Sequence, residues 1–197
     1  MNKFESIDLL LQANGGFIKT SDVEKLGVSR TYLGKYVSDR GLERVAHGLY
    51  MSQDAWVDRM YIIQTRYPNA IFSHETALYL LNIAEREPTQ YAVTLIAGTN
   101  ATGLTKQGVK AYKVRKDLFS EGIIEVDTPF GHKVKAYNAE RTICDLIRSR
   151  RNIEIQDLTA ALKAYVRLKG KNLPLLMRYA KSFSIEKIIR QYLEVLL

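Results

Sequence analysis

The sequence predicts an α+β protein made of a small helical unit with a hairpin and a larger mixed part. Two observations lead to this class. The first fifty residues alternate short amphipathic helical segments with glycine turns and end in two short strands. Strand-like segments between residues 91 and 137 are then followed by helical periodicity to the end of the chain. The 197 residues are 46% hydrophobic, which is enough to bury a core in each part.

The composition excludes several classes of protein. Cys144 is the single cysteine, so neither an internal disulfide framework nor a multi-thiolate zinc site is expected. Glu5 and Asp8 interrupt any apolar signal core at the start, and no run of roughly 18 apolar residues offers a membrane span. We therefore expect a reduced, soluble, cytoplasmic protein that makes no contact with a membrane.

Two helices are expected at the start of the chain. Apolar residues at helical spacing predict the first one, which ends at Asn14-Gly15-Gly16; they are Phe4, Ile7, Leu10 and Leu11. A short second helix begins at Thr20 or Ser21 and carries Val23 and Leu26 inward. It stops before Gly27, because a glycine can take the left-handed conformation that a tight turn between helices requires.

A third helix follows the glycine turn. Ser29 can cap it, Leu33 and Tyr36 point to one side, and polar side chains point to the other. This order is that of a helix-turn-helix, whose last helix enters the DNA major groove. Arginine and lysine can donate hydrogen bonds to guanine edges or phosphates, and serine and threonine can contact bases or backbone. The candidate DNA contacts on this helix are Ser29, Arg30, Thr31, Tyr32, Lys35 and Arg40.

Two strands joined by a tight turn come directly after that helix. Residues 42–45 and 49–51 read as the strands, and Ala46-His47-Gly48 as the turn. A hairpin in this place is the wing of a winged helix-turn-helix, which puts Arg44 and His47 beside the DNA backbone or minor groove. The alternative is a packing module with a solvated polar face. We place the domain boundary after residue 52, giving domains 1–52 and 53–197.

The run from Gly16 to Met51 resembles the N-terminal domain of AbiEi-type antitoxins. The residues that carry the resemblance are Leu26-Gly27-Val28-Ser29 and Leu42-Glu43-Arg44-Val45-Ala46-His47-Gly48-Leu49-Tyr50, above all the Gly48-x-Tyr50 ending. AbiEi-type proteins are repressor–antitoxins of abortive-infection, type IV toxin–antitoxin systems, which act in phage defence. Related sequences often have arginine where this chain has His47, so this wing should contact phosphate more weakly, or only when the ring is protonated.

The resemblance implies two activities. The winged helix would bind inverted repeats in double-stranded DNA of its own promoter and repress the operon. The C-terminal domain would counter a toxin, in this family a nucleotidyltransferase, without a stable toxin–antitoxin complex. We expect a monomer in solution.

Residues 53–197 predict the larger α+β domain. Trp56, Met60, Ile63 and Tyr67 indicate an amphipathic helix that ends at Pro68. Strand-like segments at 91–96, 109–114, 123–128 and 134–137 predict a small, mostly antiparallel sheet. From residue 138 to the end the pattern is helical.

The positive charge is concentrated in the last third of the chain. The net charge is +8, of which residues 1–50 carry +1 and residues 141–197 carry +7. A basic surface attracts RNA, DNA or an acidic protein, whereas solvated helix faces with local glutamate partners are the plainer interpretation. The candidate basic effector surface comprises Arg148, Arg150, Arg151, Lys163, Arg167, Lys169, Lys171, Arg178 and Lys181.

No constellation of catalytic residues is found, so we expect neither an enzyme nor a cofactor. Leu104 stands where the lysine of a phosphate loop would follow Gly98 and Gly103. The three histidines share no metal-ligand spacing, and no metal site is expected. Two other functions stay open: a ligand-responsive transcription factor unrelated to a toxin, and an RNA-binding protein that uses the basic C-terminal surface.

Overall fold

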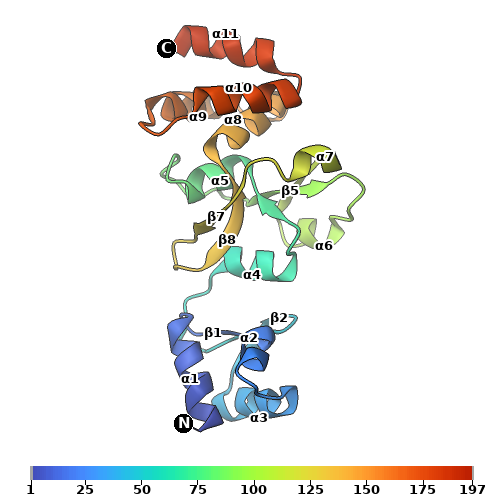
Figure 1. Cartoon of the computed structure of the whole chain (residues 1–197), viewed down its shortest axis with the longest axis vertical. Helices are drawn as coiled ribbons and strands as arrows, with labels where there is room; N and C mark the ends of the chain where they lie inside the picture. The colour runs from blue at the N-terminus through green and yellow to red at the C-terminus, as the bar shows by residue number, and fades with distance from the viewer. Residues whose placement is uncertain (1, 197) are drawn as a thin grey trace. The chain divides into compact units, whose positions relative to one another are not determined.

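A computed structural model describes residues 2–196 of the chain, which form two compact units. The first unit is Met1–Pro68 with Asp127–Val134, and the second is Asn69–Val126 with Lys135–Leu197. Figure 1 labels their helices and strands. The segment Asp127–Val134, the tip of a hairpin, is thus counted with the first unit although it lies far along the chain.

The first unit contains the predicted helix-turn-helix and wing. Its elements are α1 (Lys3–Ala13), β1 (Phe17–Lys19), α2 (Thr20–Lys25), α3 (Arg30–Arg40), β2 (Glu43–Ala46), β3 (Leu49–Met51) and α4 (Arg59–Arg66). The three strands form an antiparallel sheet in the order β1-β3-β2. Strand β1 was not expected: Phe17 and Ile18 pair with Met51 and Tyr50, which ties the start of the helix-turn-helix to the wing.

Local interactions explain where α3 begins and ends. The Ser29 side chain accepts a hydrogen bond from the backbone N–H of Tyr32, and Gly41 ends the helix in the left-handed conformation. Two expected core positions are wrong. Leu26 is 49% exposed because α2 stops at Lys25, and Trp56 is 80% exposed because α4 begins only at Arg59.

The second unit is the predicted α+β part. Its sheet has the order β6-β5-β4-β8-β7. The strands are β4 (Ile71–Phe72), β5 (Ala92–Ile96), β6 (Lys110–Val114), β7 (Ile123–Asp127) and β8 (Lys133–Tyr137). The helices are α5 (His74–Leu80), α6 (Thr102–Thr105), α7 (Lys116–Phe119), α8 (Ala139–Arg148), α9 (Ile155–Arg167), α10 (Leu173–Ser182) and α11 (Glu186–Leu196), with a 3-10 turn at Arg150–Asn152.

The α+β class is confirmed, and the larger sheet is more mixed than expected. Strands β4 and β5 are antiparallel, whereas β4 pairs with β8 and β5 pairs with β6 in parallel. The β5–β6 pair is parallel because the chain between them crosses over through α6, and β4 pairs in parallel with a strand far along the chain. A strand as short as β4 gives little signal in a sequence.

The core of the second unit forms around α8. Every residue from Glu140 to Ile147 is buried, and α9, α10 and α11 cover this helix. Cys144 is 0% exposed and packs in this core, where burial raises the pKa of its thiol. Among the described residues, no helix is both long and apolar enough to cross a membrane.

Candidate nucleic-acid interface

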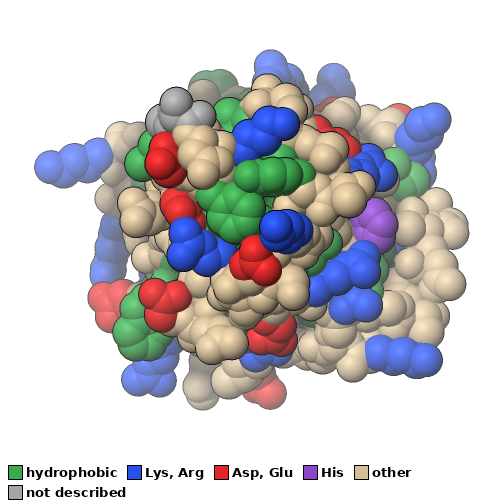
Figure 2. Space-filling view, turned by 90° about the horizontal axis from the view of Figure 1, so that it is seen from below, with side chains coloured by type: hydrophobic (Ala, Val, Ile, Leu, Met, Phe, Trp, Pro, Cys, Tyr) green, Lys and Arg blue, Asp and Glu red, His purple; other side chains and the backbone are tan. Residues whose placement is uncertain are grey.

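Helix α3 divides its side chains as the sequence predicts. Leu33 and Tyr36 are buried in the core of the first unit, while Arg30, Thr31 and Lys35 are exposed. The division follows the 3.6-residue period of the helix. Figure 2 views the protein from the side of α1 and α3, where Lys and Arg side chains lie around a histidine and acidic side chains are interspersed.

A groove of about 410 Å³ lies between α3 and the wing. Its walls come from the start of α2, from α3 and from the β2–β3 hairpin. The lining residues are Lys19, Thr20, Ser21, Glu24, Arg30, Leu33, Gly34, Arg44, His47, Gly48, Tyr50 and Thr65. The structure thus brings together three predicted contacts, Arg30, Arg44 and His47, from two separate elements.

The groove also contains Lys19, which the sequence analysis did not select. Lys19 is the last residue of β1 and immediately precedes α2. Its ammonium lies 4.5 Å from the centre of the Tyr61 ring, and burial lowers its pKa. A basic residue directly before a helix of a helix-turn-helix is the sequence feature that would have identified it.

Arg30 is held in place by a carboxylate. Its Nε lies 2.5 Å from Glu24 Oε1, and both side chains stay exposed. The hydrogen bond to Glu24 raises the pKa of Arg30, so the guanidinium is charged at every physiological pH. One carboxylate thus fixes the position of Arg30 at the edge of the groove and leaves part of its guanidinium open to an anion.

Tyr32 and Arg40 lie on a different side of α3, facing α1. The Tyr32 ring meets the Phe4 ring edge-on with a centroid distance of 5.3 Å. Arg40 Nη2 lies 2.6 Å from Asp8 Oδ2, while the Tyr36 hydroxyl donates to Asp8 Oδ1 over the same distance. Both predicted contacts therefore already help to join α3 to α1. Ser29 is similarly engaged as the cap of α3.

The hairpin tip of the first unit is fixed by a buried hydrogen-bond cluster. His132 Nδ1 lies 2.7 Å from Asp58 Oδ2, and Nε2 lies 3.2 Å from the backbone oxygen of Asn14. Both ring nitrogens therefore have a hydrogen-bond partner inside the first unit. Thr128 Oγ1 donates to the same oxygen of Asp58 at 2.6 Å, and the His132 ring stacks on Tyr61.

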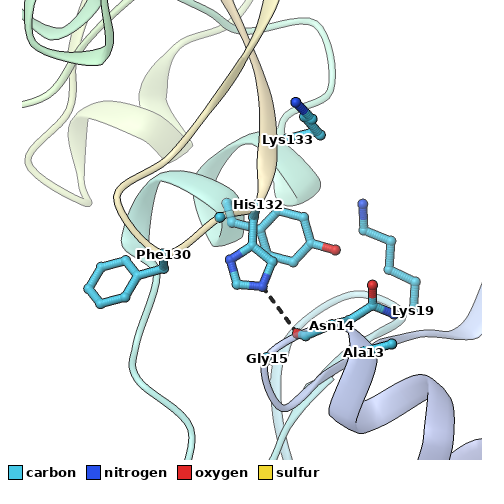
Figure 3. A pocket seen from close by; sticks show the side chains of 9 residues that line it. Ala13, Asn14, Gly15, Lys19, Phe130, His132 and Lys133 are labelled. Carbon is cyan, nitrogen blue, oxygen red and sulfur yellow. Dashed lines mark hydrogen bonds between the residues drawn. The ribbon is translucent and has the colours of Figure 1, made fainter. Parts of the chain in front are cut away.

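Figure 3 shows the hollow beside this cluster, with a volume of about 270 Å³. Its lining residues are Ala13, Asn14, Gly15, Lys19, Tyr61, Phe130, Gly131, His132 and Lys133. Lys19 lines both this hollow and the groove. The hydrogen bonds of His132 are satisfied inside the unit, which makes it a fixed structural residue and not a free ligand.

The predicted basic effector residues of the second unit differ in their surroundings. Arg148 Nη1 lies 3.4 Å from Asp145 Oδ1, and Arg150 Nη1 donates to the Ile147 carbonyl. Lys171 Nζ donates to the Leu168 carbonyl, and the Arg178 guanidinium lies over the Tyr179 ring. Seven of the nine are exposed to solvent: Arg148, Arg151, Lys163, Arg167, Lys169, Arg178 and Lys181.

The second unit also contains buried polar groups that the sequence analysis did not identify. Arg141 is 0% exposed, and its Nε lies 3.0 Å from Asp145 Oδ2. His74 is stacked on Tyr112, has a left-handed backbone with φ of 52°, and contacts Ser149 Oγ through Nε2. The i,i+4 spacing of Arg141 and Asp145 in the sequence indicates an ion pair, although it does not indicate that the pair is buried.

Among residues 2–196, no group of three His, Cys, Asp or Glu is placed to hold a metal ion.

The N-terminal part of the sequence matches a known protein family. Residues 5–53 match the family model described as "Transcriptional regulator, AbiEi antitoxin". No curated protein matches the sequence. The fold is similar to that in the crystal structure of the RV2827C protein from Mycobacterium tuberculosis, with a TM-score of 0.57 and 12% identity, over 92% of this chain and 72% of that chain. At that identity the likeness describes the fold alone.

The family match confirms the resemblance that the first fifty residues carry. It covers most of α1, the helix-turn-helix and the wing, so α3 and every residue that lines the groove except Thr65 lie within the matched segment. The N-terminal segment of this chain, residues 5–53, is therefore similar to the AbiEi antitoxin family of transcriptional regulators.

Proposed function

We propose that this protein is the antitoxin and autorepressor of a type IV toxin–antitoxin operon. The winged domain binds inverted repeats in the operon's own promoter. One observation carries the proposal: cationic side chains from β1, α3 and the wing converge on a single groove inside the segment that matches the antitoxin family. Because a monomer offers one such groove, each half of an inverted repeat takes one copy of the chain.

The two kinds of contact fall to different residues. Thr31 and Lys35 stand on the outward face of α3, where they can reach base edges in the major groove. Lys19, Arg30 and Arg44 line the groove, where phosphate is the natural partner of their charges. Base contacts supply the sequence preference, whereas phosphate contacts supply affinity that falls as salt rises.

The second unit acts as a non-catalytic effector. It counters a nucleotidyltransferase toxin without forming a stable complex with it. The exposed basic residues of α9 and α10 are the surface that we assign to this activity, because +7 of the net charge lies in residues 141–197.

Repression and rescue in cells test both halves of the proposal. The promoter of the operon is fused to a reporter, and the protein is supplied from a second plasmid with or without the toxin encoded beside it. The expected result is a silenced reporter and rescued growth. Substitution of Lys35 by alanine should restore reporter expression but keep growth rescue. A wild-type protein that leaves the reporter fully active would contradict the repressor function.

A further inference from the structure

Gly34 lies in the middle of the recognition helix, at a position where the fold gives no reason for a glycine. It is exposed, it lies one helical turn after Arg30, and it lines the groove together with Arg44 and His47. Its neighbours Leu33 and Lys35 point respectively into the core and into solvent. The surface of α3 at Gly34 is thus bare backbone.

Neither backbone conformation nor packing requires this glycine. The nine glycines with positive φ include Gly27, Gly41 and Gly48 of the same unit, but not Gly34. A Cβ built at Gly34 meets no atom within 4 Å beyond its chain neighbours and its own helix. A glycine inside a helix costs roughly 1 kcal/mol relative to alanine. Alanine would therefore fit and would stabilise the helix.

We propose that Gly34 is a specificity-determining contact, where DNA approaches the backbone of α3 too closely for a side chain. This inference rests on the proposed function of the groove. No atom of the protein would clash with a methyl group at this position, so only a partner bound in the groove could exclude one. The partner is a polyanion, because Lys19, Arg30 and Arg44 surround the bare patch.

The geometry implies that base edges, not phosphates alone, reach the helix at this point. Thr31 and Lys35 flank Gly34 on the outward face of α3, and Arg30 and Arg44 flank it on the side of the wing. Gly34 has no side chain, and it lies between residues that we assign to bases and residues that we assign to phosphates. The helix can therefore lie deeper in the major groove at this point. Side chains added there should weaken specific binding more than non-specific binding.

Three variants and two measurements test this role. Gly34→Ala and Gly34→Gln add side chains of increasing size, both with high helix propensity. Gly170→Ala is the matched control, because Gly170 also has open space around an added Cβ and lies in the second unit. Thermal unfolding and binding to the duplex upstream of the gene, against a scrambled duplex at the same salt, are measured for each.

We expect the Gly34 variants to be more stable than wild type but to bind the cognate duplex more weakly. Gly34→Ala should unfold at a higher temperature than wild type and bind the cognate duplex about tenfold more weakly, and Gly34→Gln roughly a hundredfold more weakly. Binding to the scrambled duplex should change little, and Gly170→Ala should bind like wild type. Gly34 variants that bind the cognate duplex within twofold of wild type overturn the role of Gly34 while the repressor function stands. A wild type that does not distinguish the two duplexes overturns the proposed function, and the role of Gly34 falls with it.

Discussion

The two basic regions of this protein use positive charge in opposite ways. In the first unit, where residues 1–50 have a net charge of only +1, the cations Lys19, Arg30 and Arg44 converge on one groove. In the second unit, residues 141–197 have a net charge of +7, yet Arg148, Arg150 and Lys171 are bound to groups of their own unit. Placement, and not the amount of charge, identifies the better candidate site.

The difference follows from where each cation stands in the fold. Side chains at the start of a helix, on its outward face and on an adjacent hairpin can point into one hollow. Arg148, Arg150 and Lys171, which lie at or after the ends of helices, instead reach nearby carbonyls and carboxylates of the second unit. An excess of basic residues in a sequence therefore predicts attraction of polyanions but does not locate a site.

The largest expected effect is on stability, and it distinguishes the buried structural Arg141 from the exposed Arg30 that we assign to DNA. Arg141→Met removes the cation that pairs with buried Asp145 and that donates to the Leu118 and Glu121 carbonyls. We expect the second unit to lose about 3–5 kcal/mol of unfolding free energy, since a buried carboxylate loses a main partner. Chemical denaturation measures the loss. Arg30→Met in the exposed pair with Glu24 is the control and should unfold at the wild-type midpoint.

The second prediction concerns α3, with Arg30 at the groove and Lys35 on its outward face. Arg30→Ala and Lys35→Ala should each weaken binding to the cognate duplex on the order of tenfold or more, because each removes a charged contact. Loss of sequence preference is expected for Lys35, and a shallower salt dependence for Arg30. Fluorescence anisotropy at two salt concentrations measures both effects. Unchanged specific binding in the double variant would remove α3 from the interface.

The third prediction uses the buried histidine of the second unit. Burial, with Lys110 and Arg148 nearby, lowers the pKa of His74 to about 3. Because the unfolded chain binds this proton near pH 6.5, the contribution of His74 to stability is complete above pH 6.5 and declines as the pH falls toward 3. The slope is about 1.4 kcal/mol per pH unit.

Denaturation between pH 7 and pH 4.5 measures this slope. His74→Asn is the control, because asparagine tolerates the left-handed backbone and does not titrate. The variant should lose that part of the pH dependence. An NMR titration in which the His74 ring takes up a proton near pH 6.5 in the folded protein would refute the assignment.

The smallest expected effect on DNA binding comes from the exposed charges of the second unit. Neutralising Lys163, Arg167 and Lys181 together should leave the sequence preference of the winged domain intact, because none of these residues lines the groove. The same variant should lose rescue from the toxin. If rescue survives, the basic surface is an ordinary solvated face and the effector site lies elsewhere.

Much of the first unit can be predicted from sequence because its signals are local. The spacing of Leu33 and Tyr36, the cap at Ser29 and the hairpin around Gly48 each depend on residues within a few positions of one another. Strand β1 is missed because three residues carry no periodicity, and its pairing with β3 joins segments about thirty residues apart. Convergence of Lys19 with Arg44 depends on that pairing.

The second unit is harder to predict because its main features depend on distant segments. The apolar positions of α8 predict a helix with one buried face, whereas both faces are covered and even Arg141 is inside. Nothing near His74 in the sequence indicates that Ser149, from the end of α8, completes its hydrogen bonds. The parallel pairing of β4 with β8 likewise joins residues 72 and 136.

The central claim is that α3, together with the groove between it and the wing, reads DNA sequence. The most direct test is binding of the purified protein to the duplex upstream of its own gene, compared with a scrambled duplex at physiological salt. The account predicts a preference on the order of a hundredfold or more. Equal binding to both duplexes with a steep salt dependence would contradict it, because charge alone would then explain the affinity.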